Sequence, residues 1–203
     1  MKYLYLILLA LATCSLKMGG WNEIKDFEQS NDVRINEAIQ KASDDFLIRI
    51  NSMNRDAFDI RPIGVYTQLV AGTNYKVILA TNTFIPGRHD LAIHEYTYTL
   101  DPIWSNSNGE RNWNDEFNRY NDPIFDETIS LNSAIYSRIH SAVSKSLMNT
   151  KYKLSFVSSI KSCNINGVTF YGVYAQTNGK NNESSFVVVQ NDDGTFTVLS
   201  QFN

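Results

Sequence analysis

Residues 68–80 read Gln-Leu-Val-Ala-Gly-Thr-Asn-Tyr-Lys-Val-Ile-Leu-Ala, and this stretch decides the fold. From Tyr75 onward the side chains alternate, so that Tyr75, Val77 and Leu79 share one face of a predicted strand. The turn before this strand, residues 69–72, is small and apolar. Exposed loop tips are usually polar, so an exposed apolar turn indicates a partner, and a buried connection is the alternative. The stretch predicts a β-hairpin whose turn is a candidate binding surface.

A helix is expected before this hairpin, and a further strand after it. Asn31 or Asp32 can cap the start of the helix. The strand begins at Leu91 and runs through Tyr98. Apolar side chains at helical spacing mark the face of the helix that packs on the sheet, namely Ile35, Ala38, Ile39, Ala42, Phe46 and Ile50.

Three short matches indicate that this pattern occurs twice in the chain. Residues 21–23 recur at 113–115, residues 35–39 at 131–135, and the strand entry at 71–72 recurs at 166–167, with offsets of 92, 96 and 95 residues. Matches in order at nearly one offset favour a duplicated unit. The polar stretch 105–111 reads as a loop, and it gives expected domains at 15–107 and 108–203.

The second copy repeats the order of helix and strands. Ser130 or Asn132 can cap its helix, and residues 186–189 and 196–199 flank a predicted turn at 191–194 that contains glycine. The apolar stripe of this helix is Ile135, Ile139, Ala142, Val143 and Leu147. The expected fold class is therefore α+β, with two repeats that each lay one α-helix across an antiparallel β-sheet.

The N-terminus reads as a signal peptide, residues 1–14. Met1 and Lys2 precede an apolar run, residues 3–11, that is too short to span a bilayer and is followed by small residues. The expected location is secreted or lumenal, with no membrane attachment after cleavage. Cleavage after Cys14 leaves Cys163, which we expect to be buried.

Composition and motifs argue against several classes of function. The net charge is −3, with 18 basic and 21 acidic residues, which gives no footprint for nucleic acid. The histidines His89, His94 and His140 match no metal-binding spacing, and no motif of nucleophilic catalysis or of phosphate binding occurs. We expect a protein that is not an enzyme and that uses no cofactor and no metal.

The hairpin and two other segments resemble cystatins, most closely stefins and plant cystatins. Residues 68–75 resemble the Gln-x-Val-x-Gly hairpin of that family and the strand after it. Residues 18–21, Met-Gly-Gly-Trp, resemble the N-terminus of plant cystatins, and residues 102–104, Pro-Ile-Trp, resemble the second hairpin, which is usually Pro-Trp. The resemblance covers residues 19 to about 117, although residues 111–117 could instead open the second copy.

This resemblance implies a function without covalent chemistry. Cystatins inhibit papain-like cysteine peptidases reversibly, because an N-terminal segment and two hairpins fill the active-site cleft. The partner implied is a peptidase of the cathepsin L or B kind, bound by a monomer, and a hairpin-exchanged dimer is a further possibility. The protease-binding residues implied are Gly19, Gly20, Gln68, Leu69, Val70, Ala71, Gly72, Pro102 and Trp104.

The second copy lacks these motifs. Residues 163–167, Cys-Asn-Ile-Asn-Gly, stand where the first copy has Gln-Leu-Val-Ala-Gly, and Asp192 and Asp193 lie near the position of the second hairpin. We therefore expect that the second copy does not inhibit papain-like enzymes. Two alternatives stay open for the whole chain: a tandem inhibitor of another protease class, such as metallocarboxypeptidases, or a binding module of the same fold without inhibitory activity.

Overall fold

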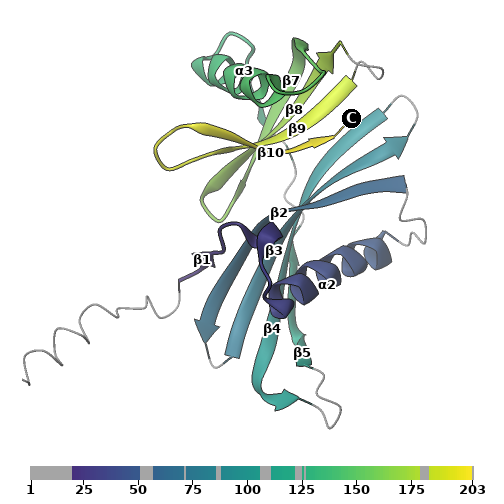
Figure 1. The fold of residues 1–203 in the computed structure, drawn as a ribbon, viewed down its shortest axis with the longest axis vertical. Helices are drawn as coiled ribbons and strands as arrows, with labels where there is room; N and C mark the ends of the chain where they lie inside the picture. The colour runs from purple at the N-terminus through teal and green to yellow at the C-terminus, as the bar shows by residue number, and fades with distance from the viewer. Residues whose placement is uncertain are drawn as a thin grey trace, which may run out of the picture.

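A computed structural model describes residues 20–50, 57–70, 72–85, 88–105, 111–121, 125, 127–178 and 183–202. The predicted signal peptide lies outside these residues. The fold is α+β, as the sequence predicts. It contains two five-stranded antiparallel sheets, and one α-helix packs against each of them (Figure 1).

The first unit holds the long strands. Its elements are β1 (Asn22–Glu23), a 3-10 turn η1 (Phe27–Gln29), α2 (Val33–Arg49), β2 (Phe58–Val70), β3 (Gly72–Ile85), β4 (Arg88–Ser105) and β5 (Arg111–Asn121). The strands lie in sequence order, β1-β2-β3-β4-β5, and each pair is antiparallel.

The second unit repeats this order with shorter strands. Its elements are β6 (Glu127–Thr128), α3 (Ala134–Leu147), β7 (Leu154–Ile165), β8 (Val168–Thr177), β9 (Glu183–Gln190) and β10 (Phe196–Phe202). Its sheet has the order β6-β7-β8-β9-β10. Element by element, β6 corresponds to β1, α3 to α2, and β7–β10 to β2–β5. Among the described residues, no helix is both long and apolar enough to cross a membrane.

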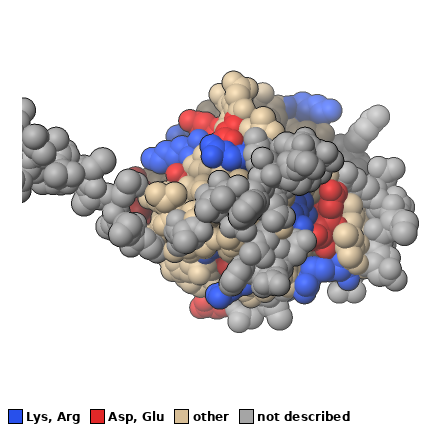
Figure 2. Space-filling view, turned by 90° about the horizontal axis from the view of Figure 1, so that it is seen from below, with Lys and Arg blue, Asp and Glu red and all other residues tan. Residues whose placement is uncertain are grey.

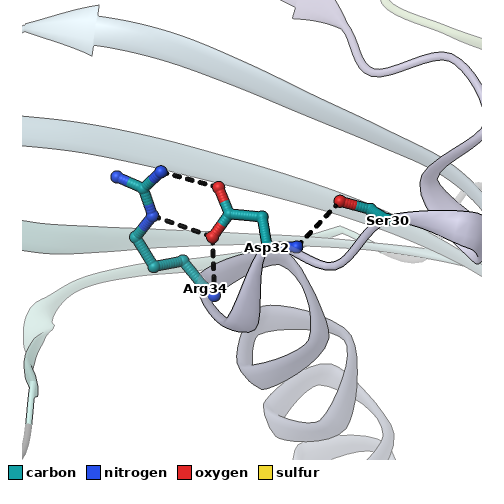
Figure 3. A network of polar contacts seen from close by, with 3 residues as sticks. All are labelled: Ser30, Asp32 and Arg34. Carbon is teal, nitrogen blue, oxygen red and sulfur yellow. Dashed lines mark hydrogen bonds and ion pairs between the residues drawn. The ribbon is translucent and has the colours of Figure 1, made fainter.

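A capping network starts helix α2 at the predicted residue. The Asp32 side chain accepts from the Arg34 backbone N–H at 2.9 Å, and the Asp32 backbone N–H donates to Ser30 Oγ at 3.1 Å (Figure 3). Such a cap satisfies one of the donors that the first turn leaves without an intrahelical acceptor. The Arg34 guanidinium also donates to both carboxylate oxygens, at 2.9 and 2.6 Å. Mainly through this hydrogen bonding, Asp32 holds the pKa of Arg34 above its ordinary value.

Each helix packs on one face of its own sheet. Ile35, Ala38, Ala42 and Phe46 of α2 are buried against one face of the first sheet, as the stripe predicts. In the second unit Ile139, Val143 and Leu147 of α3 are buried in the same way. The strand residues that meet the helices include Tyr75, Val77, Leu79, Val173 and Ala175.

The opposite faces of the two sheets pack against each other. One buried cluster joins Ile63, Ile78, Ala80, Leu91 and Ile93 of the first unit to Cys163, Ile165, Phe170, Val187 and Phe202 of the second. The molecule therefore has four layers, helix, sheet, sheet and helix (Figure 1). Cys163 is 6% exposed within this cluster, which confirms that it is buried. We call this contact the inter-sheet interface.

Close contacts and hydrogen bonds lock the inter-sheet interface. A Cβ on Gly172 of β8 would lie 3.2 Å from Leu91 of β4, so the glycine lets the two strands approach closely. The Leu91 backbone N–H donates to the Tyr174 hydroxyl at 3.2 Å. At another point Arg61 of β2 donates to the Gln201 carbonyl at 2.5 Å. The units are therefore joined by specific contacts as well as by apolar burial.

The domain boundary expected after residue 107 is wrong. Strand β5, residues 111–121, pairs with β4, so the first unit extends to Asn121 and the polar stretch 105–111 connects two strands of one sheet. The match of residues 21–23 to 113–115 is also wrong. Residues 113–115 lie in β5 of the first unit, whereas the strand of the second unit that is equivalent to β1 is β6. Pairing in a sheet is non-local, and a short match in sequence does not report it.

The helix match is also out of register. Residues 131–133 precede α3, and Ser133, rather than Ser130 or Asn132, caps it by accepting from the Tyr136 N–H at 3.1 Å. The buried positions 38, 42 and 46 of α2 correspond to 139, 143 and 147 of α3, an offset of 101 residues. The hairpin match at 71–72 and 166–167 is correct, because both positions join the first two long strands of their unit.

Candidate functional site

The N-terminal segment and two hairpins of the first unit converge at one end of its sheet. Asn22 pairs with Thr67, so Gly20 and Trp21 run beside the last residues of β2. Val70 pairs with Gly72 across the β2–β3 turn, and Thr73 pairs with Leu100. We call this region, Gly20–Trp21 together with residues 68–70, 72–73, 100–105 and 111–113, the hairpin end. In Figure 1 the ends of β2 and β4 lie in the lower part of the molecule, away from α3, and β1 lies at the left.

The β2–β3 turn combines an exposed apolar side chain with a glycine. Leu69 is 59% exposed, although it is a large hydrophobic residue. Gly72 has a φ of 142°, a conformation that side-chain-bearing residues rarely adopt. Leu69, on β2 just before the turn, is thus presented to solvent, whereas Gly72 on the other side of the turn is buried.

A ladder of polar side chains fixes this hairpin from behind. Asn74 Nδ2 donates to Gln68 Oε1 at 3.0 Å, and Thr99 Oγ1 donates to Asn74 Oδ1 at 2.8 Å. These three residues belong to β2, β3 and β4. The ladder therefore couples the turn to the strand that leads to Pro102 and Trp104. Gln68 is engaged within the hairpin, and Leu69 is the side chain that the hairpin presents.

The second hairpin projects beyond the first. Strand β4 runs to Ser105, past the point where Thr73 and Leu100 pair. Pro102 and Trp104 are part of this strand extension, which Ile103 does not interrupt. Their side chains, that of Val70, and the whole of Gly19 and Ala71 lie outside the described residues. The backbone alone brings residues 102–104 to the hairpin end.

A groove that the sequence did not reveal lies behind Leu69. It has a volume of about 330 Å³ and is lined by Asn22, Ile24, Asp32, Arg34, Ile35, Thr67, Leu69, Thr73 and Tyr75. Its polar lining includes the capping pair of α2, Asp32 and Arg34, and its apolar lining includes Leu69. The sequence offers one signal for it, the predicted cap at Asp32, but the neighbourhood of Leu69 and the helix start depends on the packing of α2 on β3.

A second cluster of polar side chains lies on the face of the first sheet that is opposite α2. Lys76 Nζ is 3.5 Å from Glu95 Oε2 and 4.4 Å from the centre of the Trp21 ring. Tyr66 pairs with Lys76 across β2 and β3. Burial raises the pKa of Tyr66, and the negative charges of Glu23 and Glu95 raise it further. These side chains sit between the hairpin end and the second unit.

Charges of both signs surround the hairpin end. Viewed from below, the described surface carries interspersed blue and red side chains at its rim (Figure 2). A mixed surface does not steer a strongly charged partner. Within the described residues, no group of three His, Cys, Asp or Glu side chains is placed to hold a metal ion.

The equivalent hairpin of the second unit is turned into the inter-sheet interface. Cys163 and Ile165, which correspond to Gln68 and Val70, are 6% and 3% exposed. Asn166 and Gly167 form the turn with φ angles of 52° and 88°, as in the type I′ turns that Asn-Gly favours. The two hairpins occupy the same place in their sheets but differ in surroundings, because only the second one packs against the other unit.

Comparison of the chain with protein-family models finds no match, and comparison with curated proteins finds none either.

Proposed function

We propose that this protein is a reversible inhibitor of papain-like cysteine peptidases, of the cystatin type, and that it acts through the hairpin end of the first unit. The observation that carries the proposal is the convergence there of Gly20, the exposed Leu69 and the end of β4. These are the three segments whose sequences resemble cystatin motifs. The strand order, with the helix between the first two strands, supports the same resemblance.

The mechanism follows from shape. A narrow turn with an apolar tip can enter the cleft of a peptidase beside its catalytic thiol, and no scissile bond need be placed for attack. Gly20 removes the Cβ where the N-terminal segment approaches that cleft. The ladder from Gln68 to Thr99 holds the turn in one conformation before binding, which reduces the entropy that ordering it would cost. The proposed partner is a peptidase of the cathepsin L or B kind in a secretory or lumenal compartment.

The second unit does not act in this way under the proposal. The residues equivalent to the inhibitory turn, Cys163 and Ile165, are buried against the first unit and cannot enter a cleft while the units are joined. The second unit lacks the Gln-Leu-Val-Ala-Gly motif, and from the sequence we expect that it does not inhibit papain-like enzymes. The burial of its turn is compatible with that expectation. The proposed stoichiometry is therefore one peptidase to one chain.

The test is a titration of papain and cathepsin L with residues 15–203. We expect stoichiometric inhibition by the wild type and at least about a 30-fold loss of affinity in Leu69→Glu, since truncation or charging of an interface anchor typically costs about 2 kcal/mol or more. Leu69 is exposed, so this variant should fold. The matched control is Leu131→Glu, an exposed leucine of the second unit (48%) that should leave inhibition unchanged.

Other outcomes would contradict the proposal. Folded wild-type protein that leaves both enzymes active would exclude the papain-like function, and inhibition of a metallocarboxypeptidase by the same sample would replace it with the tandem-inhibitor alternative. Equal inhibition by wild type and Leu69→Glu would keep the activity but move the site away from the β2–β3 turn.

A further inference from the structure

A line of contacts connects the second unit to the residue that follows Gly20. Asn166, in the β7–β8 turn, donates through Nδ2 to Glu95 Oε2 of β4. The same Glu95 oxygen lies 3.5 Å from Lys76 Nζ of β3. Lys76 Nζ in turn lies 4.4 Å from the centre of the Trp21 ring, within the range of a cation–π contact. Four residues from two units thus form one continuous relay.

The ion pair between Lys76 and Glu95 is largely buried, and burying two charges costs free energy. Lys76 is only 5% exposed, and the side chains of Lys76 and Glu95 are 7% and 14% exposed. Removing two charges from water is repaid only when other groups hydrogen-bond the remaining atoms. Asn166 supplies a hydrogen bond of that kind to Glu95, and the Trp21 ring covers Lys76. Loss of the Asn166 amide should therefore change how Lys76 and Glu95 are held, and with them Trp21.

We propose that the second unit positions the N-terminal inhibitory segment of the first, with Asn166, Glu95 and Lys76 as positioning residues that act through Trp21. This inference rests on the proposed function. Trp21 immediately follows Gly20, so the way in which its ring is held bears on how Gly20 is presented at the hairpin end. The β7–β8 hairpin, which lacks the inhibitory motif, acts on the hairpin end of the first unit through Asn166 in its turn.

The first experiment reads Trp21 directly and needs no peptidase. The chain contains three tryptophans, which 5-fluorotryptophan labelling makes visible by ¹⁹F NMR, and Trp21→Phe assigns the Trp21 signal. The variant is Asn166→Gly, because glycine accepts the positive φ of this turn while removing the amide. We expect the Trp21 signal to shift or broaden. The control Asp192→Ala, in the exposed β9–β10 turn, should leave it in place. An unchanged Trp21 signal in Asn166→Gly would overturn the proposal.

The second experiment asks whether the effect passes through the N-terminal segment. Asn166→Gly is compared with wild type in the chain 15–203 and in a chain that begins at Gly20. We expect about a threefold to tenfold weaker affinity for papain in the long chain, and less than about a twofold change in the short one. An equal loss in both chains would mean that Asn166 merely stabilises the fold, which would overturn the positioning role.

The two proposals fail in different ways. Absence of papain inhibition by the wild type removes the proposed function, and the relay is then judged by the Trp21 signal alone. Inhibition by the wild type together with unchanged affinity in Asn166→Gly keeps the function and overturns the positioning role.

Discussion

The amide of Asn74 donates to the side-chain oxygen of Gln68 at 3.0 Å, which ties the two strands of the β2–β3 hairpin together behind its turn. Gln68 is therefore engaged within the hairpin, and under the proposed function the contact with a peptidase is made by Leu69. Replacing Gln68 with alanine should cost about 1 kcal/mol of hairpin stability and weaken papain inhibition about fivefold. Hydrogen exchange of the Leu69 and Thr73 amides measures the first effect, and a papain titration the second.

Gln68→Glu serves as the control for this variant, since a carboxylate also accepts from the Asn74 amide. We expect the slow exchange of the hairpin amides to be kept in Gln68→Glu. If exchange were unchanged in Gln68→Ala, the bond between Gln68 and Asn74 would not be what fixes the turn.

Gly172 sets the spacing of the two sheets. A Cβ there would lie 3.1 Å from Phe125 and 3.2 Å from Leu91, tighter than ordinary contact. Gly172→Ala should therefore lower the free energy of unfolding by about 1–3 kcal/mol, the usual cost of overpacking. Denaturant titration gives the value. The double variant Gly172→Ala, Leu91→Val should recover part of the loss, and strictly additive losses would show that the two positions do not clash.

Stability should fall at alkaline pH through Tyr66. Burial raises the pKa of this phenol above its ordinary value, which is about 10. A group whose pKa is higher in the folded than in the unfolded protein contributes stability that is fully present below its unfolded pKa. This contribution is lost as the pH rises from the unfolded toward the folded pKa. Between pH 9 and pH 11, the wild type should therefore lose more stability than Tyr66→Phe.

The same measurement on Tyr171→Phe provides a comparison, because burial and Glu127 raise the pKa of Tyr171 as well. Each variant should remove the part of the stability loss at alkaline pH that is due to the tyrosine it replaces. An identical pH dependence in the wild type and Tyr66→Phe would contradict the assignment to Tyr66.

The start of α2 depends on Asp32. Asp32→Ala removes the acceptor for the Arg34 N–H and should destabilise the protein by about 1 kcal/mol. Asp32→Asn keeps a capping oxygen but removes the charge that pairs with the Arg34 guanidinium. It should therefore cost only a few tenths of a kcal/mol, because exposed ion pairs contribute little. Thermal unfolding of both variants, monitored by circular dichroism, measures the difference, and equal losses would place the effect in the ion pair.

Local patterns in the sequence predicted much of each unit. The period of two in residues 75–80 and the helical stripe from Ile35 to Phe46 are properties of the chain itself, so strand and helix could be read without tertiary information. The cap at Asp32, the burial of Cys163 and the hairpin turn at 191–194 followed from equally local chemistry. The exposure of Leu69, just before the β2–β3 turn, fits the sequence pattern at 69–72.

The tertiary structure decided how these pieces associate. Whether residues 111–121 close the first sheet or open the second unit depends on hydrogen bonds to β4, which no local pattern encodes. The inter-sheet interface also needed the fold, although the unbroken apolar run Val77–Ala80 carried a signal for it, since such a run is typical of strands buried on both faces. The relay from Asn166 to Trp21 joins residues far apart in the chain, and only the packing of one sheet on the other brings them together.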